Sequence, residues 1–298
     1  MSMTKSLESN RNLAKGLCFV LPWIIGFFLF TAVPMALSFY YSFCDYSLLQ
    51  RPAFIGWRNY YELWFDPIFW VVLRNTGIYA AIALPAGVVF ALTLALLLNA
   101  RIRGQAIYRT IIFLPSLVPS VASAMLWLWL LNARLGLVNT VLRAAGAHDP
   151  PAWLGDRRWA MISLIVMSLW GLGNTVVIYL AGLQDVPREL YEAAELDGAG
   201  ALRRVWHVTL PCISPVIFFN IVMAIIATAQ IFGTPYIMTG GGPARSTYFY
   251  TMYLYDNAFT YLKMGYASAM SWIQFFIVLA ITAVAAMASK RWVHYSSK

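Results

Sequence analysis

The stretch from Val71 to Asn99 reads VVLRNTGIYAAIALPAGVVFALTLALLLN, and it decides what kind of protein this is. It is apolar almost throughout, and its one charged residue, Arg74, lies near an end. An α-helix needs about 20 mostly apolar residues to cross the hydrocarbon core of a bilayer. The stretch therefore predicts a membrane-spanning helix.

The same character recurs along the chain. Further apolar windows cover residues 16–43, 110–133, 159–183, 211–233 and 264–289. The chain is 61% hydrophobic and 11% charged, whereas soluble domains are about 25% charged. Together the windows predict an all-α, polytopic membrane protein with six transmembrane helices and both termini on one side.

The first window follows Lys5, Arg11 and Lys15, so a cleaved signal peptide is an alternative interpretation. We expect a retained helix, because the apolar stretch is long and no clear small-residue cleavage site precedes the next loop. Cys18, Cys44 and Cys212 show no spacing typical of a metal site or disulfide framework. They are predicted to be packing residues.

The net charge of +9 is explained by topology. Its basic residues do not cluster with aromatic platforms as in a nucleic-acid-binding surface. A cytoplasmic N-terminus places 12 of the 21 Lys and Arg residues inside, as the positive-inside rule requires, although Arg157 and Arg158 then lie outside. The outer segments 44–70, 134–158 and 234–263 are rich in aromatic residues, which we expect to anchor at the membrane interface in preference to stacking on sugars.

The windows contain no Asp, Glu or Lys. Ionisable groups inside a membrane are typical of proton and ion relays, so the sequence argues against a carrier driven by an ion gradient. It also contains no Gly-Lys dipeptide, HExxH or GxSxG, which excludes a P-loop and the corresponding catalytic motifs. A passive pore and a channel-forming subunit powered by another protein remain.

The loop between the fourth and fifth windows, residues 184–211, distinguishes these two possibilities. It reads QDVPRELYEAAELDGAGALRRVWHVTLP. Pro187 suits a first helical turn, and Gly198 can adopt the left-handed conformation that ends a helix. Glu189, Glu192 and Glu195 fall on one face, where Arg188 can pair only with Glu192. This acidic stripe fits either a docking surface or a solvated amphipathic helix.

The same stretch resembles the EAA signature of the membrane subunits of ATP-binding cassette importers. The match comprises Glu192-Ala193-Ala194, then Gly198 after three residues, and Val208-Thr209-Leu210-Pro211 after nine more, with Val208 where the family usually has Ile. The resemblance implies that this loop is a coupling helix seated on a cytoplasmic ATPase subunit. It implies that Glu192 faces a basic residue of the ATPase and that Gly198 makes the turn. The ATPase-coupling residues that follow from it are Glu192, Ala193, Ala194, Asp197, Gly198, Leu210 and Pro211.

Three shorter matches are similar to carbohydrate-type permeases such as the maltose and glycerol-phosphate permease subunits. They are Gly56-Trp57-Arg58-Asn59-Tyr60, Gly136-Leu137-Val138-Asn139, and Gly240-Gly241-Gly242-Pro243 followed by Ser246-Thr247. The resemblance implies the type I importer permease fold. Its expected parts are an N-terminal helix and outer interfacial segment at 1–70, a five-helix permease core at 71–289 and a cytoplasmic tail at 290–298.

The resemblance also implies the partners. They are a second permease subunit, two ATPase subunits that bind ATP and magnesium, and an extracytoplasmic solute-binding protein. This chain is then a non-catalytic subunit without a cofactor or metal of its own, and it lies in the bacterial inner membrane with both termini in the cytoplasm.

Neutral polar groups inside the windows are candidates for contact with the solute, because amides both donate and accept hydrogen bonds. The preferred candidates are Asn174, Tyr179, Asn220 and Gln230, since spans beside the coupling loop line the path in this family. Asn75, Asn132 and Gln274 are also present, and Trp127 or Trp129 could stack on a sugar, although packing between helices is the more common role of all these groups. Three alternatives stay open: a stand-alone carrier or channel, an intramembrane enzyme, and an exporter.

Overall fold

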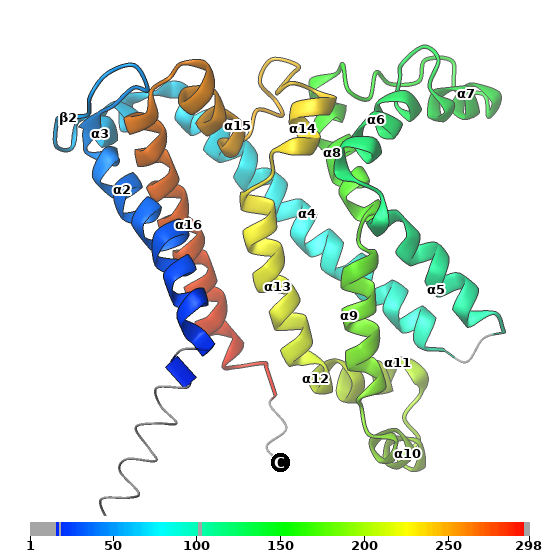
Figure 1. The fold of residues 1–298 in the computed structure, drawn as a ribbon. Coiled ribbons are helices and arrows are strands. Elements are labelled where there is room, and N and C mark those ends of the chain that lie inside the picture. Colours follow the sequence, from blue (N-terminus) through cyan, green and yellow to red (C-terminus); the bar gives the residue numbers. More distant parts are fainter. Residues whose placement is uncertain (1–15, 18, 101–102, 295–298) are drawn as a thin grey trace, which may run out of the picture. The chain divides into compact units, whose positions relative to one another are not determined.

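The computed structural model describes residues 16–17, 19–100 and 103–294. The predicted features at Lys5, Arg11, Lys15 and Cys18 lie outside these residues. The described chain is almost entirely helical (Figure 1). It divides into two compact units: unit 1 comprises residues 1–65 and 255–273, and unit 2 comprises residues 66–254 and 274–298.

Unit 1 holds the first apolar helix and a small outer subdomain. Its helix runs from Phe19 to Ser42. The elements of this unit are η1 (Phe28–Ala32), α2 (Val33–Ser42), β1 (Cys44–Asp45), β2 (Ala53–Phe54), α3 (Arg58–Phe65), η4 (Asp256–Thr260) and the first part of α16 (Met264–Ser289). The two strands pair antiparallel, Cys44 opposite Phe54, and are a short exception to the predicted all-α fold.

Asn59 fastens this outer subdomain. Its side chain is 6% exposed, and its Nδ2 donates to the carbonyl oxygens of Ser42 and Cys44, at 2.9 Å each. The chain turns at Gly56, just before α3. The φ of Gly56 is +63°, a backbone conformation that residues with a Cβ rarely adopt. The first short motif is therefore a structural one: a glycine turn followed by an asparagine that closes the chain after the first span.

Unit 2 contains the remaining spans and the connecting segments 134–158 and 184–211. Its elements are α4 (Pro67–Asn99), α5 (Gln105–Phe113), η2 (Leu114–Leu117), α6 (Ser120–Leu130), α7 (Leu137–Ala144), α8 (Arg157–Trp170), α9 (Gly173–Gln184), α10 (Arg188–Leu196), α11 (Ala201–Arg204), η3 (Val205–Thr209), α12 (Leu210–Cys212), α13 (Ser214–Ala229), α14 (Gly233–Met238), α15 (Tyr250–Tyr255) and the end of α16. Figure 1 shows α10, α11 and α12 at one end of unit 2, and α7 and α14 at the other.

Two of the six predicted spans are not single helices. Four helices of the described chain are long and apolar enough to cross a membrane, and two bent pairs raise the number to six. The 110–133 window bends by 99° between η2 and α6, and the 159–183 window bends by 48° between α8 and α9. Pro119 precedes α6 and Gly171 precedes α9, and both residue types interrupt helices.

The long helix α4 organises unit 2, because α8, α9 and α13 all pack against it. Small residues allow close approach: Ala91 and Ala95 of α4 are fully buried against α9. A Cβ on Gly173 would lie 2.9 Å from the carbonyl oxygen of Ile112 in α5, and one on Gly182 would lie 3.0 Å from Val216 in α13. Small residues at helix contacts are typical of membrane proteins, where tight packing replaces the hydrophobic effect.

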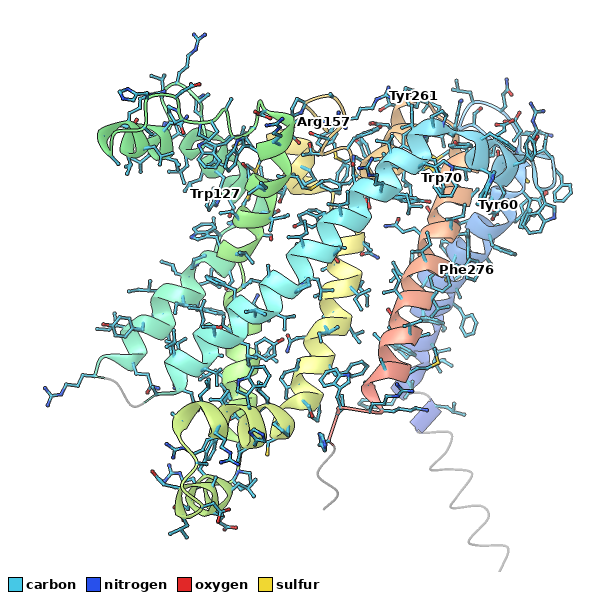
Figure 2. All side chains as sticks on the ribbon, turned by 180° about the vertical axis from the view of Figure 1, so that it is seen from behind. Tyr60, Trp70, Trp127, Arg157, Tyr261 and Phe276 are labelled. Atoms are coloured by element: carbon cyan, nitrogen blue, oxygen red, sulfur yellow. The ribbon has the colours of Figure 1, made fainter. Side chains whose placement is uncertain are left out.

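Asn139 closes the loop between α7 and α8. It is fully buried, its Nδ2 donates to the carbonyl oxygens of Ala133 and Pro151 at 3.0 and 3.2 Å, and its Oδ1 accepts from Trp153 Nε1 at 2.6 Å. Gly136 of the same motif has no room for a side chain, because a Cβ would overlap backbone atoms of Asn132. Arg157, at the start of α8, lies at this end of unit 2 (Figure 2).

Side-chain hydrogen bonds to backbone carbonyl groups also stabilise the glycine-rich loop before α15. The buried Thr247 has one hydroxyl proton to share between two acceptors, Gly242 O at 2.6 Å and Thr239 Oγ1 at 2.7 Å from its Oγ1. Asn75 of α4 donates to the carbonyl oxygens of Arg245 and Tyr248 at 2.7 and 3.0 Å. All three short motifs thus supply polar side chains that satisfy loop carbonyls.

Gly265→Ala tests the packing inside unit 1. A Cβ at Gly265 would overlap the carbonyl oxygen of Cys44, so we expect a loss of about 1–3 kcal/mol. Gly77→Ala is the control, because nothing lies within 4 Å of its Cβ in mid-helix, and it should be neutral or stabilise by about 0.5–1 kcal/mol. Thermal unfolding in detergent measures both, and equal midpoints would contradict this packing.

Candidate functional site

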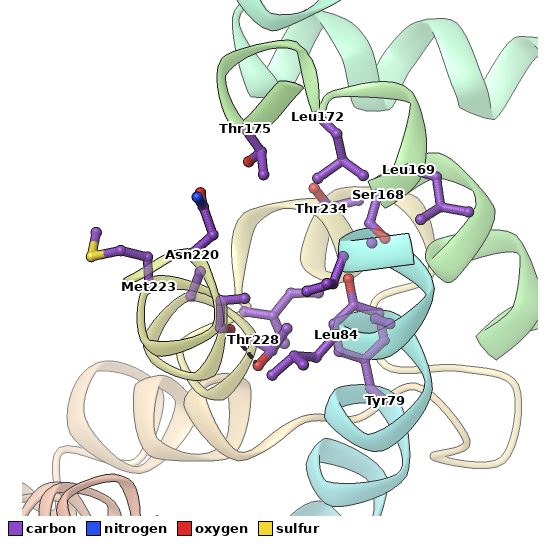
Figure 3. Close-up of a pocket in the computed structure, with 16 residues that line it drawn as sticks. Tyr79, Leu84, Ser168, Leu169, Leu172, Thr175, Asn220, Met223, Thr228 and Thr234 are labelled. Atoms are coloured by element: carbon purple, nitrogen blue, oxygen red, sulfur yellow. Dashed lines mark hydrogen bonds between the residues drawn. The ribbon is translucent and has the colours of Figure 1, made fainter. Parts of the chain in front are cut away.

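A cavity of about 450 Å³ lies in unit 2 beside the break between α8 and α9 (Figure 3). Helices α4, α8, α9 and α13 supply its walls, and Thr234 of α14 adds one side chain. A broken helix within a bundle is a common place for a solute site, because the two halves diverge there. The cavity is the leading candidate for such a site in the described chain.

The lining is neutral and partly polar. Its polar side chains are Tyr79, Ser168, Thr175, Asn220, Thr228 and Thr234, and its other members are apolar. None of the lining residues carries a charge. Hydroxyl and amide groups both donate and accept hydrogen bonds, so the surface suits a neutral solute rich in hydroxyl groups.

Several of these groups are already hydrogen-bonded on one side. Asn220 Nδ2 donates to Val216 O at 2.9 Å, Thr228 Oγ1 to Ala224 O at 2.7 Å, and Ser168 Oγ to Ile165 O at 2.7 Å. Bonding to a carbonyl of the same helix satisfies the donor in an apolar medium. Each group keeps an acceptor, and those acceptors are available to the hydroxyls of a ligand.

The structure brings only one of the four predicted pathway residues into this lining. Asn220 lines the cavity. Tyr179 is fully buried among α4 and α9 residues such as Ala91 and Ala95. Asn174 and Gln230 are exposed and lie outside the lining.

The remaining predicted groups lie outside the lining of this cavity. Asn132 Oδ1 accepts from the backbone N–H groups of Arg134 and Leu135, and Gln274 Nε2 donates to Ala229 O at 2.7 Å. Trp127 packs edge-to-face with Trp170, and Trp129 is 59% exposed. Neither tryptophan lines the cavity, so neither can stack on a ligand bound there.

Residues 184–211 join α9 directly to α13, and both helices line the cavity. Helix α10 ends as the sequence predicted: Gly198 has a φ of +73°. Gly198 N donates to Glu195 O at 3.0 Å, and Ala199 N donates to Ala194 O at 2.9 Å. These two bonds form a Schellman motif, which satisfies the last carbonyls of the helix.

One side of α10 is tied to the segment that leads into α13. The hydroxyls of Tyr191 and Thr209 lie 3.0 Å apart, and Thr209 is 2% exposed. Leu210 and Pro211 follow in the short helix α12, and Ile213 after them is buried in the core with α9. The Tyr191–Thr209 contact thus joins α10 to the segment that leads into α13.

The other side of α10 is open. Glu192, Ala193 and Asp197 are exposed, and Leu196, Leu202 and Trp206 are 90%, 73% and 63% exposed. Large apolar side chains gathered beside acidic ones are typical of a protein interface.

The acidic stripe is paired at Glu195, and the pair that Arg188 could make with Glu192 is not formed in the described chain. Arg204 Nη1 lies 3.4 Å from Glu195 Oε1, and an Arg188–Glu192 pair is absent from the described residues. The fold explains this, because the Gly198 turn brings α11 back beside the end of α10. Glu192 therefore keeps its carboxylate unpaired within the described chain.

The family described as "Binding-protein-dependent transport system inner membrane component" matches residues 83–294. The probable ABC transporter permease protein YesP of Bacillus subtilis (strain 168) is 39% identical over 301 residues, covering 100% of this chain and 97% of the relative. The sulfoquinovosyl glycerol transport system permease protein SmoG of Agrobacterium fabrum is 36% identical, covering 84% of this chain and 82% of the relative.

The fold has a close counterpart among solved structures. A chain of a bacterial ABC transporter involved in the import of the acidic polysaccharide alginate superimposes with a TM-score of 0.84 at 25% identity. The match covers 98% of this chain and 99% of that chain. The fold seen here is thus shared over nearly its full length.

Substitution of Gly198 tests the end of α10. Gly198→Val should open the Schellman motif, because a left-handed conformation costs a residue with a Cβ about 1–2 kcal/mol. Gly198→Asn is the matched control, since asparagine tolerates this conformation. We expect hydrogen exchange at amides 198 and 199 to quicken about 5- to 30-fold in the valine variant only. Equal exchange in both variants would show that the turn does not depend on this conformation.

Proposed function

The chain belongs to the family of inner membrane components of binding-protein-dependent transport systems, and on that premise we propose how it works. It forms half of the translocation pathway of an ATP-driven importer for a sugar or sugar-like solute. One observation carries the proposal: the loop 184–211 links the two helices, α9 and α13, that wall the neutral cavity.

The energy enters through α10. Its open face, with Glu192 and the exposed Leu196, seats on one of two ATPase subunits, which bind ATP and magnesium. The sequence of this chain holds no P-loop, so hydrolysis belongs to the partner and this subunit is non-catalytic. Closure of the ATPases moves α10, the Tyr191–Thr209 contact passes that motion to α13, and the spans switch access to the cavity.

The solute class follows from the lining. A neutral cavity with six hydroxyl or amide side chains favours a carbohydrate, since each sugar hydroxyl both donates and accepts. Sulfoquinovosyl glycerol and alginate are both built from sugars but are anionic, so these relatives support the carbohydrate class, and the uncharged lining alone argues for a neutral member of it. Asn220 is the contact that both the sequence and the cavity support.

A second permease subunit completes the path. Asn174 and Gln230 are exposed within or beside apolar spans, and an amide that faces hydrocarbon alone is unfavourable. These side chains instead face the pathway or the second subunit, so they remain proposed pathway contacts. An extracytoplasmic binding protein delivers the solute to the outer loops.

The orientation rests on charge. The end of unit 2 that carries α10 also carries Arg188, Arg203 and Arg204, and the positive-inside rule places such an end in the cytoplasm. Both termini then lie in the cytoplasm, in a bacterial inner membrane. The alternative role of the loop, a solvated amphipathic helix, does not account for its exposed leucines and tryptophan.

Glu192→Lys tests the coupling proposal. Reversal of this unpaired charge should leave the chain inserted but lower ATP-dependent uptake at least about tenfold, as when one partner of an interface ion pair is lost. Asp149→Lys, the same reversal on the exposed outer loop before α8, should leave uptake within about twofold. Normal uptake by the Glu192 variant would refute the proposed role of α10.

Asn220→Leu and Thr228→Val test the cavity. Each removes one ligand acceptor, so we expect the KM for uptake to rise about 5- to 10-fold, with ATPase assembly unchanged. Thr93→Val is the control, because Thr93 makes the same kind of bond to its own helix, to Val89 O at 2.7 Å, but is exposed outside the cavity. An unchanged KM in both cavity variants would place the solute elsewhere.

A further inference from the structure

Arg109 is an unpaired cation in a second, smaller cavity. It lies on α5, and its Nε is buried without a hydrogen-bond partner. The cavity has a volume of about 230 Å³ and is walled by α5 and α9, with Leu98 from the end of α4. The proposed transport cycle gives this group no role.

The surroundings offer the guanidinium no counterion. The other lining residues are Leu98, Ile112, Phe113, Gly173, Val176, Val177, Leu180, Ala181 and Gln184. Gln184 is the one other polar side chain among them, and none is acidic. Asp185 is next in sequence but lies outside the lining, and both ion pairs of the described chain involve other residues. A guanidinium nitrogen buried without a partner is costly, so the site suits an anion that the described residues do not supply.

The cavity opens at an apolar surface. Val177 of α9 lines the cavity itself and is 47% exposed. In a membrane-spanning chain such a side chain suits acyl chains. Gln184 ends α9 where the loop to α10 begins, so the cavity lies at the end of unit 2 that carries the basic residues, where lipid head groups are found.

We propose that this cavity binds the phosphate group of an anionic membrane lipid, with Arg109 as the counterion and Gln184 as a second donor. The acyl chains lie over Val177 and the neighbouring apolar residues of the lining, Ile112 and Ala181. A basic pocket between spans at the cytoplasmic side is a known arrangement for acidic head groups. The exposed apolar rim favours a lipid over free phosphate, which has nothing to place there.

Occupancy of this site has a mechanical consequence. Helices α5 and α9 are already in close contact at Gly173, and the lipid would also join them at Arg109 and Gln184, where the loop 184–211 begins. The bound lipid thus stabilises the helix that receives the motion of α10. This makes the composition of the membrane a regulator of the subunit, independent of which solute it carries.

Native mass spectrometry of the full chain with its co-purified subunits tests the site directly. The complex is titrated with dioleoylphosphatidylglycerol and with dioleoylphosphatidylcholine. We expect selective retention of phosphatidylglycerol that falls about tenfold or more in Arg109→Gln, because one charge-assisted bond is lost. Arg109→Lys should retain most of the binding. Arg103→Gln, an exposed cation just before α5, should change it less than about twofold.

A second variant guards against a folding defect at Arg109. Val177→Trp fills the mouth of the cavity and leaves the cation in place, so it should lower phosphatidylglycerol retention to a similar extent. Equal retention in Arg109→Gln, Val177→Trp and the unaltered chain would overturn the proposal.

Two other outcomes would also overturn it. If inorganic phosphate raises the unfolding midpoint as much as phosphatidylglycerol does, the site takes free phosphate. If a structure of the assembled complex shows a carboxylate of another subunit within hydrogen-bond distance of Arg109, the cation serves subunit assembly. Each result is independent of the proposed solute and of the coupling role of α10.

Discussion

Every backbone N–H and C=O group in the hydrocarbon core must find its partner inside the protein, and the architecture follows from that requirement. Continuous helices meet it on their own, as in α4. Where a span breaks, as between α8 and α9, packed neighbours must shield the break, and the space left beside it becomes a cavity with hydroxyl groups. The break between α8 and α9 interrupts helical hydrogen bonding in the membrane, and the cavity beside this break is the one that can hold a polar solute.

The same requirement shapes the outer loops, although by different means. Asn59, Asn139 and Thr247 each turn a buried side chain onto loop carbonyls, and glycines at positions 56, 136 and 241 supply turns or close approaches. The short motifs shared with carbohydrate permeases therefore have a physical content: they hold rigid the end of the chain that faces the proposed binding protein. The coupling loop has a comparable design, with a Schellman turn at Gly198 and one clamp at Tyr191–Thr209.

Hydropathy predicted the spans because a bilayer demands long apolar segments, and Gly198 was predictable because only a left-handed residue ends α10 in this way. The two bends could have been predicted from the helix-interrupting residues Pro115, Pro119, Gly171 and Gly173. Hydropathy missed them because the sequence stays apolar on both sides of each bend. The cavity hydroxyls could not be identified, because serine and threonine bond to their own helix throughout the chain, as Thr93 does. Tyr179 was predicted to contact the solute because of its hydroxyl group. The alanines of α4 that bury its ring are distant in sequence, so its burial could not be predicted.

The central claim is that the loop 184–211 moves the walls of the cavity when the ATPases close. Spin labels at positions 177 of α9 and 219 of α13, both exposed, measure it in the assembled transporter, with the accessible cysteines replaced by serine. The account predicts that the distance distribution between the labels shifts when ATP and magnesium are added, and that Glu192→Lys abolishes the shift. An unchanged distribution in a complex that binds ATP would contradict the account.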